Sequence, residues 1–178
     1  MMKSACLAVL AAMCIAVTGE ARANVIAAAA DGFTIVIEVD VAVTPDVAYL
    51  KFVNGPALWW DDAHTYSGKA AHMSLDPRAG GCFCEQIDGG GSISHGTVLY
   101  ADPGNALRLS AALGPLQEMA VIGTLSVAFA PRTEGTHVTL TYRVFGGFMT
   151  DAVELSKLVD TVMTTQLQRY AAHAGRAG

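Results

Sequence analysis

The sequence predicts one α+β domain in which a curved antiparallel sheet of about seven strands packs against a long C-terminal helix. Three observations lead to this fold class. Residues 33–43 alternate apolar and polar side chains as a strand does. Residues 70–145 consist almost entirely of strand and turn signals. Residues 151–173 repeat apolar side chains at helical spacing, so we expect one face of this helix to cover the apolar face of the sheet.

The N-terminus has the three parts of a secretory signal peptide. Lys3 supplies a positive charge, residues 5–17 form an uncharged apolar run of 13 residues, and residues 21–23 (Ala-Arg-Ala) form a small-x-small cleavage site. The run is too short for a helix across a bilayer core of about 30 Å. We therefore predict a signal peptide over residues 1–23 and a periplasmic or secreted protein. The alternatives are an uncleaved anchor and a lipoprotein, although the residue before Cys14 is not the small one that lipid attachment requires.

Removal of residues 1–23 leaves about 155 residues, enough for one domain with a substantial core. We expect an alanine-rich, flexible lead-in over residues 24–31 and the domain itself over residues 32–175. The formal net charge changes from −5 to −6, because two basic residues and one acidic residue leave with the signal peptide. This acidic composition argues against nucleic acid as a partner. No later apolar run reaches about 18 residues, so no stable membrane insertion is expected after cleavage.

Two short helices should follow the first strand. Thr44 can cap a helix, and Pro45 suits the first helical position, which predicts a helix over residues 47–53. Asn54 and the glycine after it end that helix, and residues 56–60 can form a second helical turn.

The middle of the chain predicts a meander of strands. Strands are expected near residues 71–75, 81–87, 94–101, 106–112, 119–129 and 137–144. Glycine, proline, aspartate and asparagine mark the turns between them. Three consecutive glycines at residues 89–91 lie between two of these strands, so they predict a hairpin turn and not a phosphate-binding loop, which precedes a helix.

The C-terminal helix should begin after a cap at Thr150 or Asp151 and end near Gly175. Its apolar side chains are Leu155, Leu158, Val159, Val162, Met163, Leu167 and Tyr170. A curved sheet closed by one helix is expected to leave an internal cavity, and cavities of this kind hold small apolar molecules.

Several segments resemble the START-like (SRPBCC) proteins. Trp59 and Trp60, followed by residues 74–83 (SLDPRAGGCF), resemble the "WW … DPRxGGxF" signature of this superfamily. The sequence is most similar to its polyketide cyclases and heat-shock-protein ATPase activator homologues, and the resemblance covers residues 33–173. It implies the helix-grip fold. It does not choose an activity, because these proteins include ligand carriers, cyclases, hydratase-like enzymes and co-chaperones.

Side chains expected at the cavity are candidates for ligand binding. They are Trp59, Trp60, Phe83, Glu85, Tyr100, Met119, Tyr142 and Met163. Glu85 shares a strand face with Phe83, so its carboxyl would have a raised pKa and could act as acid or base or anchor a ligand. The alternatives are that Glu85 pairs with an arginine at the sheet edge, and that the apolar candidates are ordinary core. The sequence identifies no catalytic residue.

Cys82 and Cys84 are the cysteines that remain after signal cleavage. Two residues apart on one strand, their Cβ atoms would lie about 7 Å apart, whereas a disulfide needs about 3.8 Å. We therefore predict free thiols. A disulfide made possible by a bulge and a soft-metal site completed by His64, His72 or His95 are the alternatives.

The sequence therefore favours an exported protein that binds a small apolar molecule in its cavity. An enzyme of the cyclase or lyase kind, with Glu85 or a histidine as proton carrier, is a second hypothesis. A protein-interaction module is the third. We predict neither a cofactor nor a metal.

Overall fold

The computed structural model describes residues 22–176, so nearly all of the predicted signal peptide lies outside the described residues. In chain order the elements are β1 (Arg22–Ala29), β2 (Gly32–Val41), α1 (Pro45–Val53), α2 (Pro56–Trp59), the 3-10 turns η1 (Asp62–His64) and η2 (Ala70–His72), β3 (Met73–Leu75), β4 (Cys82–Ile87), β5 (Gly91–Asp102), β6 (Ala106–Ser110), the 3-10 turn η3 (Gly114–Glu118), β7 (Ala120–Arg132), β8 (Gly135–Gly147) and α3 (Ala152–Ala174). From β2 onward, the strands and helices follow the predicted order.

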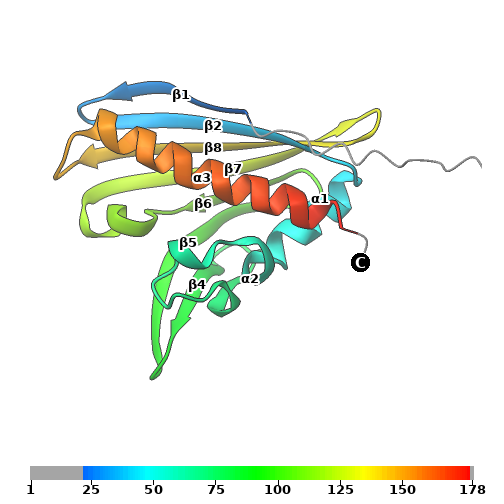
Figure 1. Cartoon of the computed structure of the whole chain (residues 1–178), viewed down its shortest axis with the longest axis horizontal. Coiled ribbons are helices and arrows are strands. Elements are labelled where there is room, and N and C mark those ends of the chain that lie inside the picture. The colour runs from blue at the N-terminus through cyan, green and yellow to red at the C-terminus, as the bar shows by residue number, and fades with distance from the viewer. Residues whose placement is uncertain (1–21, 177–178) are drawn as a thin grey trace, which may run out of the picture.

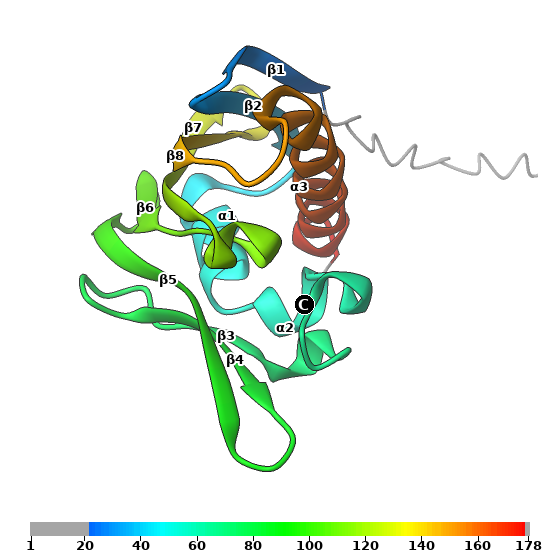
Figure 2. The same cartoon turned by 90° about the vertical axis from the view of Figure 1, so that its left-hand side faces the viewer.

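The strands form one antiparallel eight-stranded sheet in the order β1-β2-β8-β7-β6-β5-β4-β3. α3 crosses the β1–β2–β8–β7 half of this sheet (Figure 1) and contacts β2 and β1. α2 contacts β3, η2 and α3, and lies beside the other half of the sheet (Figure 2). Within residues 22–176, no helix is long and apolar enough to cross a membrane.

β2 has the alternation that the sequence predicts. Its inward side chains, Phe33, Ile35, Ile37, Val39 and Val41, are all buried. Ten consecutive residues of β2 pair with β8, and β8 in turn pairs along its whole length with β7. This alternation leaves one face apolar, and α3 covers it.

Residues 24–31 do not form the flexible lead-in expected from their composition. Arg22–Ala29 form β1, which pairs with β2 from Arg22 opposite Glu38 to Ala29 opposite Gly32. Alanine carries no strand signal, but the free edge of β2 offers a row of backbone donors and acceptors to any extended segment beside it. The sheet therefore has eight strands where about seven were expected.

α3 begins at the predicted cap. The Asp151 carboxylate accepts hydrogen bonds from the amides of Val153 (2.8 Å) and Glu154 (3.0 Å). The prediction that Leu158 faces the sheet is wrong, because this side chain is 65% exposed. Leu158 precedes the buried Met163 by five residues, which places it about 140° away around the helix.

Candidate functional site

An apolar cavity lies between the sheet, α2 and α3. Four aromatic side chains line it, namely Phe52, Trp59, Trp60 and Phe83. α3 contributes Met163, Gln166 and Leu167, and each of four strands contributes one leucine. Its volume is about 20 Å³, which is room for about one water molecule. The expected location of the cavity is confirmed. The cavity is smaller than a small organic molecule requires, because side chains fill most of the interior.

Packed aromatic rings account for the small volume. The ring centroids of Phe52 and Trp59 are 5.0 Å apart, and Tyr170 contacts both rings. Trp60 continues the cluster, 5.6 Å from Trp59 and 5.4 Å from Phe83. Such tilted and edge-on pairs stabilise one another beyond their buried area. Trp59 and Trp60 therefore fill space in which a ligand was expected from the sequence.

Both indole N–H groups bond to backbone carbonyls. Trp59 Nε1 donates to the carbonyl of Phe52 at 3.3 Å, and Trp60 Nε1 donates to that of His64 at 2.9 Å. The two rings are 4% and 6% exposed. They form part of the cavity wall and are not at an open mouth.

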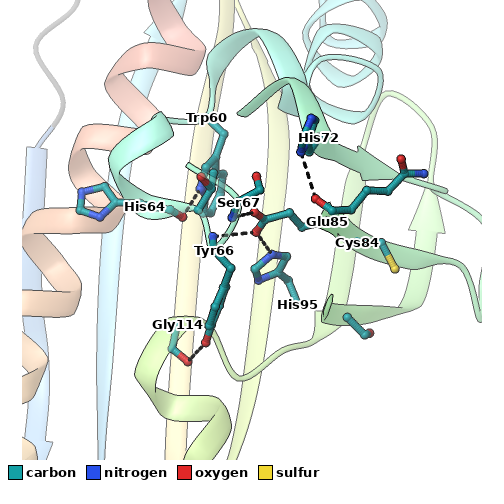
Figure 3. Close-up of polar contacts among 12 residues, drawn as sticks. Trp60, His64, Tyr66, Ser67, His72, Cys84, Glu85, His95 and Gly114 are labelled. Carbon is teal, nitrogen blue, oxygen red and sulfur yellow. Dashed lines mark hydrogen bonds and ion pairs between the residues drawn. The ribbon is translucent and has the colours of Figure 1, made fainter. Parts of the chain in front are cut away.

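Glu85 and His95 form a buried polar pair beside the aromatic cluster (Figure 3). His95 Nε2 lies 2.9 Å from Glu85 Oε2, and the two side chains are 4% and 0% exposed. The backbone amides of Tyr66 (3.1 Å) and Ser67 (2.5 Å) also donate to this carboxylate. The pair thus attaches the segment after η1 to β4 and β5. Glu85 does not line the apolar cavity.

The hydrogen bonds to Glu85 decide its ionisation. Burial by itself would raise the pKa of this carboxyl. The hydrogen bonds from Ser67, Tyr66 and His95 outweigh burial, so the pKa of Glu85 lies below its ordinary value. The raised pKa expected from the sequence is wrong, because the sequence does not show that Tyr66, Ser67 and His95 converge on the carboxylate.

The structure brings four of the candidate residues together at the cavity: Trp59, Trp60, Phe83 and Met163. Tyr100 lies elsewhere, because the register shifts between Val98 and Tyr100 where β5 pairs with β6. This bulge turns the tyrosine outward, 46% exposed, with its hydroxyl 3.2 Å from an Asp102 carboxylate oxygen.

Tyr142 and Met119 support the fold away from the cavity. The buried Tyr142 hydroxyl donates to the carbonyl of Ala111 (3.0 Å) and accepts from the amide of Leu113 (3.2 Å), and burial raises its pKa. It thereby holds the connection between β6 and η3. Met119 follows η3 and packs half-buried on the core.

Cys82 and Cys84 form a disulfide, so the prediction of free thiols is wrong. The register between β4 and β5 shifts at this point, where Phe83 pairs with Gly96 and Cys84 with Ser94. The Cα atoms of the two cysteines are 5.3 Å apart, less than the spacing of about 6.6 Å along a regular strand. The same bulge directs the intervening residue, His95, to the interior.

The DPRAGG segment, which carries part of the resemblance, builds a turn. Arg78 hydrogen bonds lower the pKa of Asp76 to about 2. Gly80 has a φ of +83°, and a Cβ at Gly81 would collide with the carbonyl oxygen of Asp76. Gly80 N donates to the carbonyl of Val98, which joins this turn to β5. The segment therefore indicates fold and does not contact the cavity.

Gln166 and Arg169 are site residues that the sequence did not single out. Gln166 of α3 lines the cavity, 1% exposed, and its Oε1 accepts from the amide of Asp61 at 2.8 Å. Arg169 donates to the carbonyls of Trp59 (2.9 Å) and Trp60 (3.2 Å). An available signal was the polar Gln166 inside the apolar stripe of the helix.

No protein-family model and no curated protein matches the sequence. Solved structures do match. The protein MLL2253 of Mesorhizobium loti is 19% identical, with a TM-score of 0.58, over 82% of this chain and 98% of that chain. The di-domain ARO/CYC protein BexL is 17% identical, with a TM-score of 0.55, over 84% of this chain and 52% of that chain. CalU16 of Micromonospora echinospora is 13% identical, with a TM-score of 0.53, over 89% of this chain and 86% of that chain.

The chain has the helix-grip fold. The curved sheet, the long C-terminal helix and the short helices after β2 are the parts that the START-like resemblance implied. At these identities the likeness concerns the fold alone. The helix-grip fold places the apolar cavity, but function has to be argued from the residues around it.

Proposed function

We propose that this chain binds a small, uncharged, apolar molecule between the sheet and α3, in a site that is closed when empty. The observation that carries the proposal is the aromatic-lined cavity beneath a short segment held to the protein by polar contacts. This segment, residues 56–69, is called the cover below. It contains α2 and η1.

The cavity wall favours an apolar ligand. Ligand sites of this kind are lined mainly by hydrophobic and aromatic side chains, with few polar groups that fix orientation. Trp59, Trp60 and Phe83 supply rigid apolar surface at low entropic cost, and Met163 can adapt its shape to an irregular ligand. A charged ligand would be disfavoured by desolvation.

A ligand larger than one water must displace the cover. Part of the cover points to solvent, since Leu58 is 66% exposed and Tyr66 is 50% exposed. It is attached by hydrogen bonds to Glu85 of β4 and to Gln166 and Arg169 of α3, and by the buried rings of Trp59 and Trp60 in the aromatic cluster. Its second part, residues 61–69, contains no buried residue, and segments with few buried apolar contacts open locally at a lower free energy than global unfolding.

The comparisons support a small-molecule role for this fold. BexL is named as a di-domain ARO/CYC from a biosynthetic pathway. Because a signal peptide is predicted, we expect the proposed binding to take place in the periplasm or outside the cell. Binding is favoured over a protein-interaction role by the apolar lining of the cavity, which is too small for a protein partner to enter.

A tryptophan fluorescence titration tests the proposal. The wild type is titrated with a panel of uncharged polycyclic and aliphatic probes, beside Trp59→Phe and Trp60→Phe variants. A well-fitting ligand should bind with micromolar affinity, on the order of −8 kcal/mol, and should perturb the indole fluorescence. The absence of any saturable change up to tens of micromolar would overturn the proposal.

A cyclase or lyase activity is a second candidate, favoured by the Glu85–His95 pair. His95 also borders an open polar groove of about 380 Å³, with Ser94 and Gln117. An enzyme of this kind would abstract a proton next to a carbonyl. Deuterium incorporation at the α-carbon of α-tetralone, followed by NMR, should then be accelerated by the wild type and not by His95→Gln. Equal rates for both proteins would exclude this role for His95.

A further inference from the structure

Gln166 uses only one end of its buried side-chain amide. Its Oε1 accepts the hydrogen bond from Asp61 N, whereas Nε2 has no hydrogen-bond partner among residues 22–176. The side chain is 1% exposed and belongs to the cavity wall. A buried donor without an acceptor is uncommon and destabilises the folded protein.

Rotation of the Gln166 side-chain amide by 180° does not give Nε2 a hydrogen-bond acceptor. It would exchange Oε1 and Nε2 and place an N–H group against the Asp61 N–H, with two donors facing each other. The contact with Asp61 therefore fixes Oε1 toward the cover and leaves Nε2 as the free end of Gln166.

The other cavity side chains do not compete for an acceptor. Both indole N–H groups donate to backbone carbonyls, and the remaining lining side chains are apolar. One water would fit the cavity, but a buried water is typically held by two to four polar groups. Gln166 is the single polar side chain that the described residues place in this wall.

We infer that Gln166 Nε2 donates a hydrogen bond to an acceptor oxygen of the ligand, so that the site selects uncharged, mostly hydrocarbon molecules that carry a carbonyl or similar oxygen. This inference rests on the proposed function and adds the ligand class. Gln166 is thereby a specificity residue, and its contact with Asp61 links recognition of the ligand oxygen to the cover.

The surroundings select a neutral acceptor over a carboxylate. No charged side chain of the described residues lines the cavity. The nearby Arg169 is engaged by the carbonyls of Trp59 and Trp60 and lies 3.6 Å from an Asp61 carboxylate oxygen. A ligand carboxylate would be buried without a counter-ion, which is unfavourable.

Two probes with the same ring skeleton test the inference. Tetralin is a hydrocarbon, and α-tetralone differs from it by one carbonyl. Calorimetric titrations of the wild type, Gln166→Met and Met163→Leu give the ratio of the two dissociation constants. The Met163→Leu variant is the control, because it changes the same wall without altering a polar group.

The wild type and Met163→Leu should bind α-tetralone roughly tenfold more tightly than tetralin, and Gln166→Met should lose that preference. In wild-type protein, ¹⁵N NMR should show the Gln166 side-chain amide shifting with α-tetralone and not with tetralin. This readout needs no variant. Unchanged ratios in Gln166→Met, with both probes bound, would overturn the inference and leave the proposed function standing. No binding of either probe or of the wider panel would overturn the proposed function itself.

Discussion

The two halves of the sheet are covered in different ways. α3 covers the β1–β2–β8–β7 half through apolar packing, with Leu155, Met163 and Leu167 among its buried side chains. The cover lies on the other half. Its first part packs through the buried rings of Trp59 and Trp60, whereas residues 61–69 contain no buried residue and are attached to Glu85 and Gln166 through hydrogen bonds. Apolar packing resists local separation, whereas a few polar contacts can be broken and remade as a unit. The first half therefore acts as a frame, and the second half contains the part that can open.

Truncation of a buried leucine in the frame should have the largest effect. Leu167 is 1% exposed, so Leu167→Ala should lower the free energy of unfolding by about 2–5 kcal/mol through lost burial and a new cavity. Leu158 is on the same helix but 65% exposed, and Leu158→Ala should stay within about 0.5 kcal/mol of the wild type. Urea unfolding of both variants measures the difference. Similar midpoints for the two would contradict the described face of α3.

Removal of the Glu85 charge should loosen the cover and leave the frame intact. Glu85→Gln keeps the shape of the side chain but places its NH₂ group against the amide donors of Tyr66 and Ser67. The free energy of unfolding should therefore decrease by about 1–3 kcal/mol. Hydrogen exchange should accelerate at the amides of Tyr66 and Ser67 and remain unchanged in α3. Gln86→Ala, at the exposed neighbouring position, is the matched control. Equal acceleration of hydrogen exchange in the cover and in α3 would mean that the two halves do not open independently.

Low pH should loosen the cover, as Glu85→Gln is expected to do. The folded pKa of Glu85 lies below its ordinary value, so its contribution to stability is present above about pH 4.3 and is lost as the pH falls through the folded pKa. Protection of the Tyr66 amide should therefore decrease in acid in the wild type more steeply than in Glu85→Gln. The same slope in both proteins would assign the acid sensitivity to other carboxylates.

Local patterns predicted the frame better than the cover. The alternation around Ile35 and the Asp151 cap are short-range signals, and both are confirmed. The outward Tyr100 depends on a bulge that strand alternation does not reveal. The lowered pKa of Glu85 depends on amides 18 and 19 residues away in the chain, so only the folded structure could show it. Of the four aromatic side chains that line the cavity, Trp59, Trp60 and Phe83 were among the residues expected there, whereas Phe52 was not.

The Cys82–Cys84 disulfide belongs to the half that contains the cover, and its removal should have the smallest effect of these changes. The loop it closes contains only the two cysteines and Phe83. By restricting the unfolded chain, this disulfide should raise the free energy of unfolding by about 1.5 kcal/mol. A double Cys82→Ser, Cys84→Ser variant should therefore remain folded, with an unchanged exchange rate in α3.

Thiol titration of denatured protein lacking residues 1–23 should detect no free thiol without reductant and two after reduction. Because the disulfide accompanies the bulge that turns His95 inward, the double variant should accelerate exchange at the Tyr66 and Ser67 amides less than Glu85→Gln does. Two thiols in the unreduced protein would show that the disulfide does not form. Acceleration greater than in Glu85→Gln would make the disulfide, and not the buried carboxylate, the main attachment of the cover.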